Sequence, residues 1–300
     1  DLKNIELKDF IDILIQNNTT RNEIAEYIKN LLINVNKKII LRYHKNLKSE
    51  DISTKTSNDD FVSIADKKSE EIISKQLKGF LDVSDILGEE TAFLDKQYDK
   101  YLDKSLLWVV DPIDGTKNYI NGKENFCSMI SLVSYMLPIA TFVYYPLKNI
   151  FVYAFKNYGA FLVDTNNNVS TRLSINQSNI LKIIGSGGTK GIPKNYRQSI
   201  LHNLKTSTDR LFIGSAGIET IMLAKNEIQF IFHGRVTPWD HSPMDLIIKE
   251  AGGCVYMATN KSEFNIKSKG SILAASNVQT WNNIRDLIIP YDNPYRKYKN

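Results

Sequence analysis

The sequence predicts a layered α/β (α+β) fold, with an antiparallel sheet in its first half and alternating strands and helices in its second. From residue 105 to residue 163, apolar segments of strand length follow one another with short turns between them, as in an antiparallel meander. Beyond the polar stretch from Asp164 to Ser170, strand-like and helix-like segments alternate, which is typical of a layered α/β lobe. A chain of 300 residues with 42% hydrophobic residues suits one two-lobed unit.

Helices open the first lobe, which we place at residues 20–170 after an N-terminal extension of residues 1–19. Apolar residues recur at helical spacing from Thr20 to Tyr43, and a second helix is expected from Ala65 to Leu77. The second helix has Asp66 in its first turn. The strands expected next are 105–111, 126–135, 139–146, 149–155 and 158–163.

The second lobe, residues 171–300, contains the alternating elements. The strands expected there are 181–184, 210–213, 228–232, 254–257 and 271–275. The helices expected there are 194–204, 218–225, 242–251 and 278–289. The sequence shows no internal repeat and no low-complexity linker between the lobes.

One uncharged run, from Ser128 to Leu147, is long enough to span a bilayer if it were a helix. Polar residues and Pro138 interrupt it, and β-branched and aromatic residues dominate it. The segment from Tyr135 to Pro138 can form a turn between two strands. We therefore expect a β-hairpin here and no membrane association.

Charge and cysteine content are those of an ordinary cytoplasmic protein. The net charge is +5, but lysines are interleaved with Asp and Glu rather than gathered into a stripe, so nucleic-acid binding is not indicated. Cys127 and Cys254 lie in apolar, strand-like surroundings and do not indicate a disulfide framework. No signal-peptide pattern is present at the N-terminus, although the start at Asp1 leaves a removed leader as an alternative.

Two carboxylate motifs, far apart in the chain, carry the chemistry. The first, Asp111-Pro112-Ile113-Asp114-Gly115-Thr116, directly follows the apolar run from Leu106 to Val110, so its aspartates are expected where a buried strand ends and a turn begins. The second is Trp239-Asp240-His241-Ser242-Pro243. Magnesium prefers oxygen ligands and is typically coordinated by one or two carboxylates together with oxygens of the substrate phosphate. Together the motifs indicate a magnesium-dependent phosphatase.

These motifs resemble the signatures of the inositol monophosphatase family. The similarity covers four ordered segments: Val62–Asp66 with Glu70, Ile86–Glu90, Asp111–Tyr119 and Trp239–Gly253. It extends over roughly residues 22 to 290. The resemblance implies a five-layer α-β-α-β-α sandwich with the active site between the two lobes. It also implies a homodimer and inhibition by lithium.

The resemblance further implies a set of metal ligands. One Mg²⁺ ion is expected to be held by Glu89, Asp111 and the backbone carbonyl of Ile113, and another by Asp111, Asp114 and Asp240, with two or three ions per site. Two metal ions can clamp the attacking and leaving oxygens of an in-line displacement at phosphorus. Asp111 is the expected bridge between them.

Each acidic residue has a simpler interpretation when it is taken alone. Asp114 before a glycine is a common turn former, and Asp66 is an ordinary residue for a helix N-terminus. Glu89 and Glu90 alone resemble a solvated surface pair. Asp240 is also placed to cap a helix beginning near Ser242. The four motifs occurring together favour metal binding.

Thr116 and Asp66 are the expected catalytic residues. By the family pattern, both hydrogen-bond to the nucleophilic water, with Thr116 orienting it and Asp66 accepting its proton. The N–H groups of Gly115 and Thr116, at the start of a short helix, are expected to contact the phosphate.

Contacts to the organic part of the substrate are less defined. Gly214, Ser215 and Ala216 resemble a family turn beside the substrate, and Ser186 lies in another predicted turn, Gly185-Ser186-Gly187. His233 stands where members that prefer inositol often have Glu or Asp, so myo-inositol is in question. His233 and Arg235 either meet a second anionic group or belong to a surface loop.

Three functions follow. The first is hydrolysis of inositol 1-phosphate or a related small polyol or sugar phosphate. The second is a different phosphatase of the same superfamily, acting on 3'(2'),5'-bisphosphate nucleotides, histidinol phosphate or fructose 1,6-bisphosphate. The third is a regulatory role in which the fold binds RNA or RNA polymerase and the phosphatase site is secondary. The sequence leaves the physiological substrate, the resting metal count and the role of residues 1–19 open.

Overall fold

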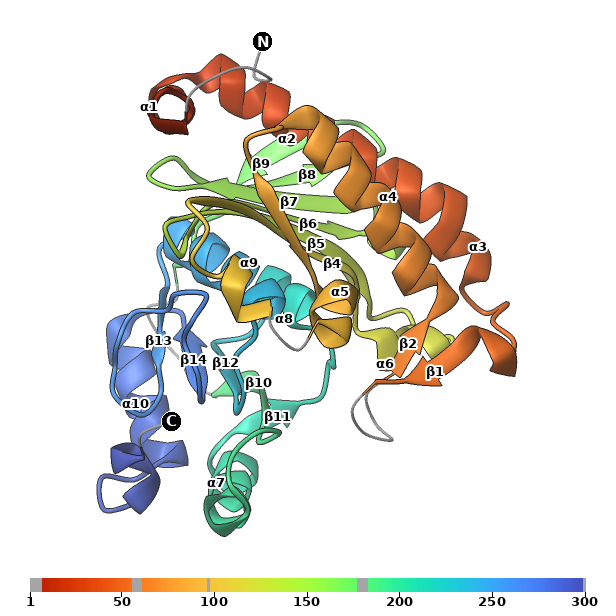
Figure 1. Cartoon of the computed structure of the whole chain (residues 1–300). Coiled ribbons are helices and arrows are strands. Elements are labelled where there is room, and N and C mark those ends of the chain that lie inside the picture. The colour runs from red at the N-terminus through yellow and green to blue at the C-terminus, as the bar shows by residue number, and fades with distance from the viewer. Residues whose placement is uncertain (1–6, 56–60, 96–97, 177–182, 299–300) are drawn as a thin grey trace.

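Five layers stack in the order helix, sheet, helix, sheet, helix (Figure 1). The structure is a computed structural model, and it describes residues 7–55, 61–95, 98–176 and 183–298. The stack confirms the predicted five-layer α-β-α-β-α sandwich. The predicted lobe boundary at residues 170 and 171 falls within the last strand of the larger sheet, Val169–Arg172.

Helices of the first quarter of the chain form the first layer. They are α1 (Leu7–Gln16), α2 (Asn18–Val35), a π-helical turn (Asn36–Ile40), α3 (Leu41–Tyr43) and α4 (Ile64–Phe80). The helix predicted from Thr20 to Tyr43 is thus continuous but changes pitch at Asn36. The side-chain nitrogen Nδ2 of Asn36 is buried there and donates to the carbonyl oxygen of Leu32 (3.0 Å) and to Ser128 Oγ (2.9 Å). Such side-chain insertion is a common cause of π-helical irregularity.

A seven-stranded sheet lies under these helices in the order β3-β4-β5-β6-β7-β8-β9. Its strands are β3 (Asp85–Gly88), β4 (Leu106–Asp114), β5 (Cys127–Ser134), β6 (Leu137–Tyr145), β7 (Ile150–Phe155), β8 (Gly159–Asp164) and β9 (Val169–Arg172). β3 pairs with β4 in parallel and every later pair is antiparallel. The predicted hairpin is β5–β6. Its two-residue turn places Tyr135 and Met136 at positive φ, +45° and +69°.

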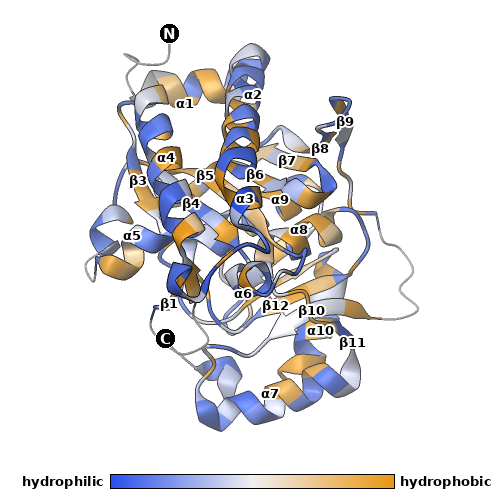
Figure 2. Cartoon of the chain, turned by 90° about the vertical axis from the view of Figure 1, so that its right-hand side faces the viewer, coloured by the Kyte–Doolittle hydropathy of each residue, from blue (hydrophilic) through white to orange (hydrophobic). Residues whose placement is uncertain are grey.

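The middle layer consists of α8 (Ala216–Ala224) and α9 (Pro238–Glu250), which lie between the two sheets (Figure 1). Most of α8 is apolar (Figure 2), as expected for a helix covered on all sides. Gly217 of α8 packs against β5 so closely that an added Cβ would overlap Cys127 Sγ. One hydrophobic core includes residues of both sheets, such as Val109 and Ile231, together with Met244 of α9.

The second sheet has five strands in the order β11-β10-β12-β14-β13, and α7 (Lys194–Ser207) and α10 (Val278–Ile288) cover its outer face. Its strands are β10 (Ile184–Gly188), β11 (Asp209–Leu211), β12 (Phe230–His233), β13 (Cys254–Met257) and β14 (Ile272–Ala275). β10 pairs in parallel with β11 and β12, and β14 is antiparallel to β12 and β13.

Two predictions in this region were wrong. The segment Gly185-Ser186-Gly187 is part of β10 rather than a turn, because its glycines make room for neighbours: a Cβ at Gly185 would overlap the Phe230 ring. The strand expected at 181–184 begins in residues outside those described. The helix predicted from residue 242 begins at Pro238, because Thr237 accepts a hydrogen bond from the Asp240 N–H (3.4 Å) and is the N-cap. Asp240 therefore lies in the first turn and is not the cap.

Shorter elements connect the layers. They are β1 (Ile52–Thr54), β2 (Phe61–Ser63), α5 (Glu89–Leu94), α6 (Thr116–Ile120) and the 3₁₀ turns Ser49–Asp51, Tyr98–Tyr101, Pro146–Lys148 and Pro294–Lys297. β1 and β2 form a separate antiparallel pair. α5 directly follows β3, and α6 follows β4 after a single residue. These two connections start at the same edge of the larger sheet because β3 and β4 are parallel.

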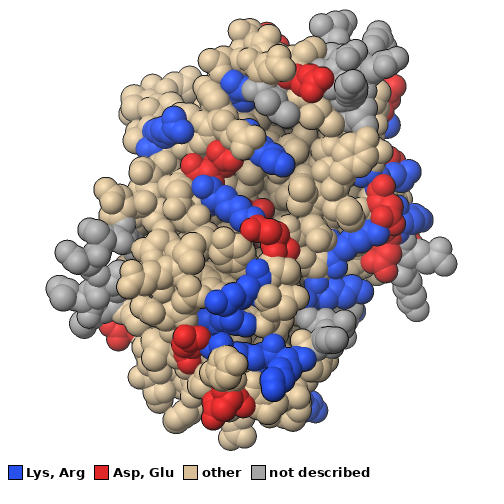
Figure 3. All heavy atoms as spheres, turned by 90° about the vertical axis from the view of Figure 1, so that its left-hand side faces the viewer, with Lys and Arg blue, Asp and Glu red and all other residues tan. Residues whose placement is uncertain are grey.

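Surface charge is mixed, as the sequence predicted. Figure 3 shows Lys and Arg close to Asp and Glu over one face. The ion pairs of the protein include Lys267 with Asp103 and Arg296 with Asp286. Cys127 and Cys254 are free and buried. Within the described residues, no helix combines the length and apolar character needed to cross a membrane.

Candidate metal and phosphate site

Three aspartates from distant parts of the chain converge between the two sheets. One carboxylate oxygen from each of Asp111, Asp114 and Asp240 lies within 4.8 Å of the others. Asp111 and Asp114 end β4, and the pairing of β4 with β5 shifts register between them. This irregularity breaks the alternation that would otherwise send Asp111 and Asp114 to opposite faces. The Ile113 N–H donates to Asp111 Oδ1 (3.0 Å), which fixes the Asp111 side chain.

Glu89 joins this cluster from the neighbouring strand. It follows β3 directly and begins α5, and its negative charge helps to raise the pKa of the Asp111 carboxyl group. Since β3 and β4 are parallel, Glu89 and Asp111 emerge at the same edge of the sheet. We name these four residues, Glu89, Asp111, Asp114 and Asp240, the acidic cluster.

Burial and mutual repulsion shape the acidic cluster. Burial is the main cause that raises the pKa of Asp111 well above its usual value, and the charges of Glu89, Asp114 and Asp240 add to it. Burial also raises the pKa of Asp240 to about 6. Buried like charges are costly unless a cation lies among them. The donor set is entirely oxygen, which matches a hard divalent cation such as Mg²⁺.

Asp66 and Thr116 lie together at the edge of the cluster. Asp66 is the third residue of α4 and forms a capping box with Ser63, whose N–H donates to Asp66 Oδ2 (2.8 Å). The Thr116 hydroxyl lies 3.2 Å from Asp66 Oδ1 and 2.9 Å from the Ile113 carbonyl oxygen. Burial raises the pKa of Asp66 to about 6.

The turn Gly214–Ala216 contacts the cluster through Asp114. The Ser215 hydroxyl donates to Asp114 Oδ2 (2.5 Å) and the Gly217 N–H donates to the same oxygen (2.8 Å). Gly214 has a φ of +75°, and Gly115 has a φ of +86° with no room for a side chain, since a Cβ would lie 2.7 Å from the Asn125 carbonyl oxygen. Thus the predicted substrate turn orients a predicted metal ligand, and its contact with substrate remains a prediction.

His233 belongs to a buried chain of hydrogen bonds on the other side of Asp240. His241 Nδ1 lies 3.0 Å from the Thr237 backbone nitrogen and 3.1 Å from the Thr237 carbonyl oxygen, and His241 Nε2 lies 3.0 Å from His233 Nδ1. His233 Nε2 then donates to Glu219 Oε2 (2.6 Å), and Ser186 Oγ donates to Glu219 Oε1 (2.6 Å). Both ring nitrogens of His233 are therefore engaged. Substrate contact by His233 and Ser186 stays a prediction.

Sequence reasoning missed Lys55. Its ammonium group lies 2.8 Å from one carboxylate oxygen of Glu89 and 2.8 Å from one of Glu90, over the Phe93 ring. Burial alone would lower the pKa of Lys55, but Glu89 and Glu90 raise it overall. Lys55 thus brings a buried positive charge to the Glu89 end of the acidic cluster. No local sequence pattern predicts the ion pairs of Lys55 with Glu89 and Glu90, because Lys55 precedes both residues by more than thirty positions.

Glu70, which the sequence indicated only as part of a motif, stabilises the first turn of α5, which contains Glu89. Its carboxylate accepts hydrogen bonds from the Glu90 N–H (2.7 Å), the Thr91 N–H (2.9 Å) and the Thr91 hydroxyl (2.6 Å). These N–H groups belong to the first turn of α5, where helical N–H groups have no partner within the helix. Gly88 leaves the space that the Glu70 carboxylate fills.

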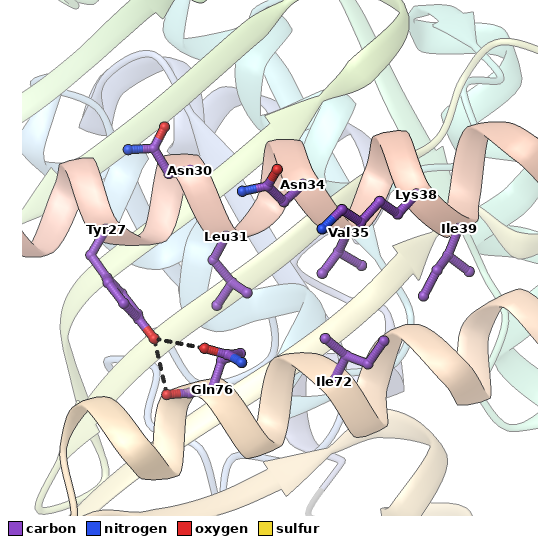
Figure 4. Close-up of a pocket in the computed structure, with 9 residues that line it drawn as sticks. All are labelled: Tyr27, Asn30, Leu31, Asn34, Val35, Lys38, Ile39, Ile72 and Gln76. Carbon is purple, nitrogen blue, oxygen red and sulfur yellow. Dashed lines mark hydrogen bonds between the residues drawn. The ribbon is translucent and has the colours of Figure 1, made fainter.

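A groove on the outer helical layer is unrelated to this site. It measures about 310 Å³ and lies between α2 and α4, where Tyr27 bonds to the Gln76 carbonyl oxygen (3.1 Å; Figure 4). The residues lining it include no Asp, Glu or His: Tyr27, Asn30, Leu31, Asn34, Val35, Lys38, Ile39, Ile72 and Gln76. The groove therefore lacks the groups that phosphate chemistry requires.

The comparison with known protein families agrees with the chemistry that the acidic cluster indicates. The model of the inositol monophosphatase family matches residues 21–290. The chain belongs to the inositol monophosphatase family. The expectation drawn from the four motifs is thereby confirmed.

Individual family members differ in their recorded roles. The chain is 28% identical over 226 residues to a fructose-1,6-bisphosphatase/inositol-1-monophosphatase of Thermotoga maritima, covering 75% of this chain and 82% of that protein. It is 26% identical over 262 residues to the Nus factor SuhB of Xylella fastidiosa, covering 84% and 89%. A solved IMPase/NADP phosphatase complexed with Mg²⁺ and phosphate has the same fold, with a TM-score of 0.72 over 95% of this chain and 99% of that one, at 17% identity.

Proposed function

We propose that this protein is a Mg²⁺-dependent phosphomonoesterase that hydrolyses inositol 1-phosphate or a related small polyol or sugar phosphate. The observation that carries the proposal is the convergence of Asp111, Asp114 and Asp240, with Glu89 at the end of the strand paired with that of Asp111. The Thr116–Asp66 pair stands beside them. The family assignment and the Mg²⁺ and phosphate complex of a structural neighbour support the same chemistry.

The residues divide into two predicted ligand sets. Glu89, Asp111 and the Ile113 carbonyl are the proposed ligands of one ion, and Asp111, Asp114 and Asp240 those of a second, with two or three ions in the complete site. Bound Mg²⁺ supplies positive charge for the phosphate oxygens and lowers the pKa of water. The hydrogen bonds from Ser215 and Gly217 leave one Asp114 oxygen, Oδ1, directed away from them and available as a ligand.

Thr116 and Asp66 have the arrangement that proton removal from water requires. The Thr116 hydroxyl joins Asp66 Oδ1 to the Ile113 carbonyl, so its position is fixed from two sides. A carboxylate with a pKa of about 6 is largely ionised at neutral pH and still close enough to accept a proton efficiently. We expect Thr116 to orient the water, Asp66 to take its proton, and the N–H groups of Gly115 and Thr116 to bind the phosphate.

The test is phosphate release by the purified protein from inositol 1-phosphate, with Mg²⁺ varied and then removed by EDTA. Activity should require Mg²⁺, return when it is restored, and fall as lithium is added. Asp240→Asn should abolish turnover, because it removes a charge that we assign to metal binding. Turnover that is unaffected by EDTA or by Asp240→Asn would refute the proposal.

Other phosphatase substrates form the first alternative. A panel of fructose 1,6-bisphosphate, a 3'(2'),5'-bisphosphate nucleotide and histidinol phosphate, assayed beside inositol 1-phosphate, separates them by kcat/KM. The name of the Thermotoga maritima relative favours including the sugar bisphosphate.

A regulatory role is the second alternative, and the similarity to a Nus factor favours testing it. The tagged protein should then retain RNA polymerase or RNA after a salt wash, and this retention should survive Asp111→Asn. Cytoplasmic location and a homodimer remain part of the proposal. Light scattering gives the oligomeric state directly.

A further inference from the structure

A buried chain of polar side chains joins the smaller sheet to both helices of the middle layer. Ser186 of β10 donates to Oε1 of Glu219 on α8 (2.6 Å), and His233 of β12 donates to Oε2 of Glu219 (2.6 Å). His233 Nδ1 lies 3.0 Å from Nε2 of His241, which belongs to α9. Ser186, Glu219 and His241 are each at most 4% exposed. We name these four residues the buried polar chain.

The two helices that the buried polar chain joins also support two aspartates of the acidic cluster. At the start of α8, the Ser215 hydroxyl and the Gly217 N–H both donate to Asp114 Oδ2. In the first turns of α9, His241 directly follows Asp240. The buried polar chain therefore connects the helix that orients one aspartate with the helix that carries the other.

The smaller sheet is the fixed end of this chain. β10 and β12 pair in parallel, and where they end the Gly234 N–H donates to the Gly188 carbonyl oxygen (2.9 Å). The loops that continue from these strands carry Lys190 and Arg235, which line a cavity of about 150 Å³ together with Asp240. One side of Asp240 thus faces open space. Its position depends on the contacts that hold the first turn of α9 from the other side.

Stability alone does not explain the buried polar chain. Burying a carboxylate and two imidazole rings is costly, and apolar side chains of similar volume often stabilise a core as well or better. α8 and α9 already share an apolar core, which includes Ile221 and Met244. Apolar contact has no preferred direction, whereas hydrogen bonds do. The buried polar chain therefore fixes how the two helices meet at the end near the acidic cluster.

We propose that Glu219 is a positioning residue of the metal site, which holds the first turn of α9, and with it Asp240, at the distance from Asp114 that bound Mg²⁺ requires. This rests on the proposed phosphatase function and adds a residue to its site. Glu219 acts through its neighbours, because its two carboxylate oxygens are bonded to Ser186 and His233. Mg²⁺ demands near-ideal octahedral geometry with ligands at about 2.0–2.1 Å, so a small shift of Asp240 should weaken its binding.

The experiment measures the Mg²⁺ affinity of the substrate-free protein by calorimetry. Glu219→Met keeps the length of the side chain but removes both hydrogen bonds, and it should weaken Mg²⁺ binding by about 10- to 100-fold, as is usual for residues that orient metal ligands. Glu219→Gln can still accept from His233 and donate to Ser186, so it should recover most of the affinity. The Mg²⁺ concentration for half-maximal phosphate release should rise with Glu219→Met by a similar factor, while KM for inositol 1-phosphate at saturating Mg²⁺ changes little.

A double substitution tests whether the effect is transmitted along the chain. His241→Leu breaks the chain at its other end, and its effect on Mg²⁺ affinity should not add to that of Glu219→Met, because either change alone interrupts the connection between α8 and α9. Additive losses would contradict the proposal. If Glu219→Met does not fold, His241→Leu has to show the loss by itself, and an unchanged affinity there overturns the positioning role.

Thr220→Val is the matched control, because Thr220 is a buried residue of α8 whose hydroxyl donates to the Ala216 carbonyl of the same helix (2.8 Å). It should leave the Mg²⁺ affinity unchanged. Wild-type affinity in a folded Glu219→Met protein, or equal losses in Glu219→Met and Glu219→Gln, overturns the positioning role and leaves the phosphatase function standing. Mg²⁺ binding that depends on Glu219 without phosphate release from any substrate overturns the phosphatase function alone.

Discussion

The two sides of the candidate site are built on different principles. On the side of the larger sheet, Asp66 and Asp111 are buried acids and Glu89 is half-buried, and they are fixed by strand ends, a helix cap and backbone N–H groups. On the side of the smaller sheet, Lys190 and Arg235 are exposed cations on loops that only glycines allow to meet. The acidic side is arranged for one chemistry, whereas the basic side can change with little effect on the fold. Substitutions on the first side should affect every substrate alike, and those on the second should alter the choice of substrate.

The largest effect is expected for Asp111→Asn. Turnover should fall by at least about 10³-fold on every substrate, since the residue bridges the proposed ions. The metal-free protein should stay folded, because a buried negative charge disappears and an amide oxygen remains to accept the Ile113 N–H. Steady-state kinetics and thermal unfolding in EDTA measure both. Asp292→Asn, at an exposed position, is the control, and residual activity above one tenth for Asp111→Asn contradicts the ligand assignment.

Thr116→Ala should come next, with kcat lower by about 10²-fold, the usual contribution of a positioned proton-transfer group. The Mg²⁺ affinity measured by calorimetry should change less than kcat, because the Thr116 hydroxyl is bonded to no carboxylate of the acidic cluster and Thr116→Ala leaves the Ile113 carbonyl in place. Thr116→Ser keeps the hydroxyl and should recover most of the rate. If serine is no better than alanine at this position, the hydroxyl is not the active group.

Gly88→Ala should lower the free energy of unfolding by displacing Glu70, which holds the first turn of α5 beside the acidic cluster. The new methyl group would overlap the Glu70 carboxylate, which cannot move without giving up its bonds to Glu90 and Thr91. We expect a loss of about 2 kcal/mol in the free energy of unfolding, typical of forced overpacking. Gly79→Ala, where nothing lies within 4 Å of the added Cβ, should be neutral or stabilising by up to about 1 kcal/mol. Urea unfolding of both variants measures the contrast, and equal stabilities would show that Glu70 can move freely.

The last prediction is a pH dependence of the stability of the metal-free protein. Burial raises the pKa of Asp66 and of Asp240 to about 6, above the usual value of 3.8 for Asp. The folded state therefore binds protons more tightly than the unfolded state. Stability should be greatest near pH 4 and fall as the pH rises through about 6.

Thermal unfolding at pH 5 and pH 8 in EDTA measures this dependence. The melting temperature should be lower at pH 8, and added Mg²⁺ should reduce or reverse the difference by offsetting the ionised carboxylates. A melting temperature that rises from pH 5 to pH 8 in EDTA would contradict the prediction.

Most of the fold was readable from the sequence because its signals are local. The hairpin from Cys127 to Tyr145 shows strand-like composition on both sides of a turn, and the acids of the first motif follow an apolar strand directly. The predicted turn Gly185-Ser186-Gly187 was misread because glycine usually marks a turn, while here Gly185 gives space to Phe230 and Gly187 to Leu204. The start of α9 at Pro238 was available in principle, since a threonine followed by proline is a common helix start.

Parts of the site were not readable, because they depend on pairs of residues that only the tertiary structure brings together. Lys55 meets Glu89, and Glu219 meets His233, across long or unpatterned separations. A lone lysine or glutamate in sequence is a surface residue by default. Only the position of Asp240 opposite Arg235 reveals that one cavity carries charges of both signs.

The position of α8 and α9 between the two sheets affects how the protein unfolds. Both helices belong to the second half of the chain, yet they fill the layer beneath the sheet made by the first half, and Gly217 is seated against Cys127. Separating the halves would expose the apolar core that both sheets share with α8 and α9, while each half also has a core cluster of its own. The polypeptide should melt in one cooperative step, because the shared core couples the two sheets.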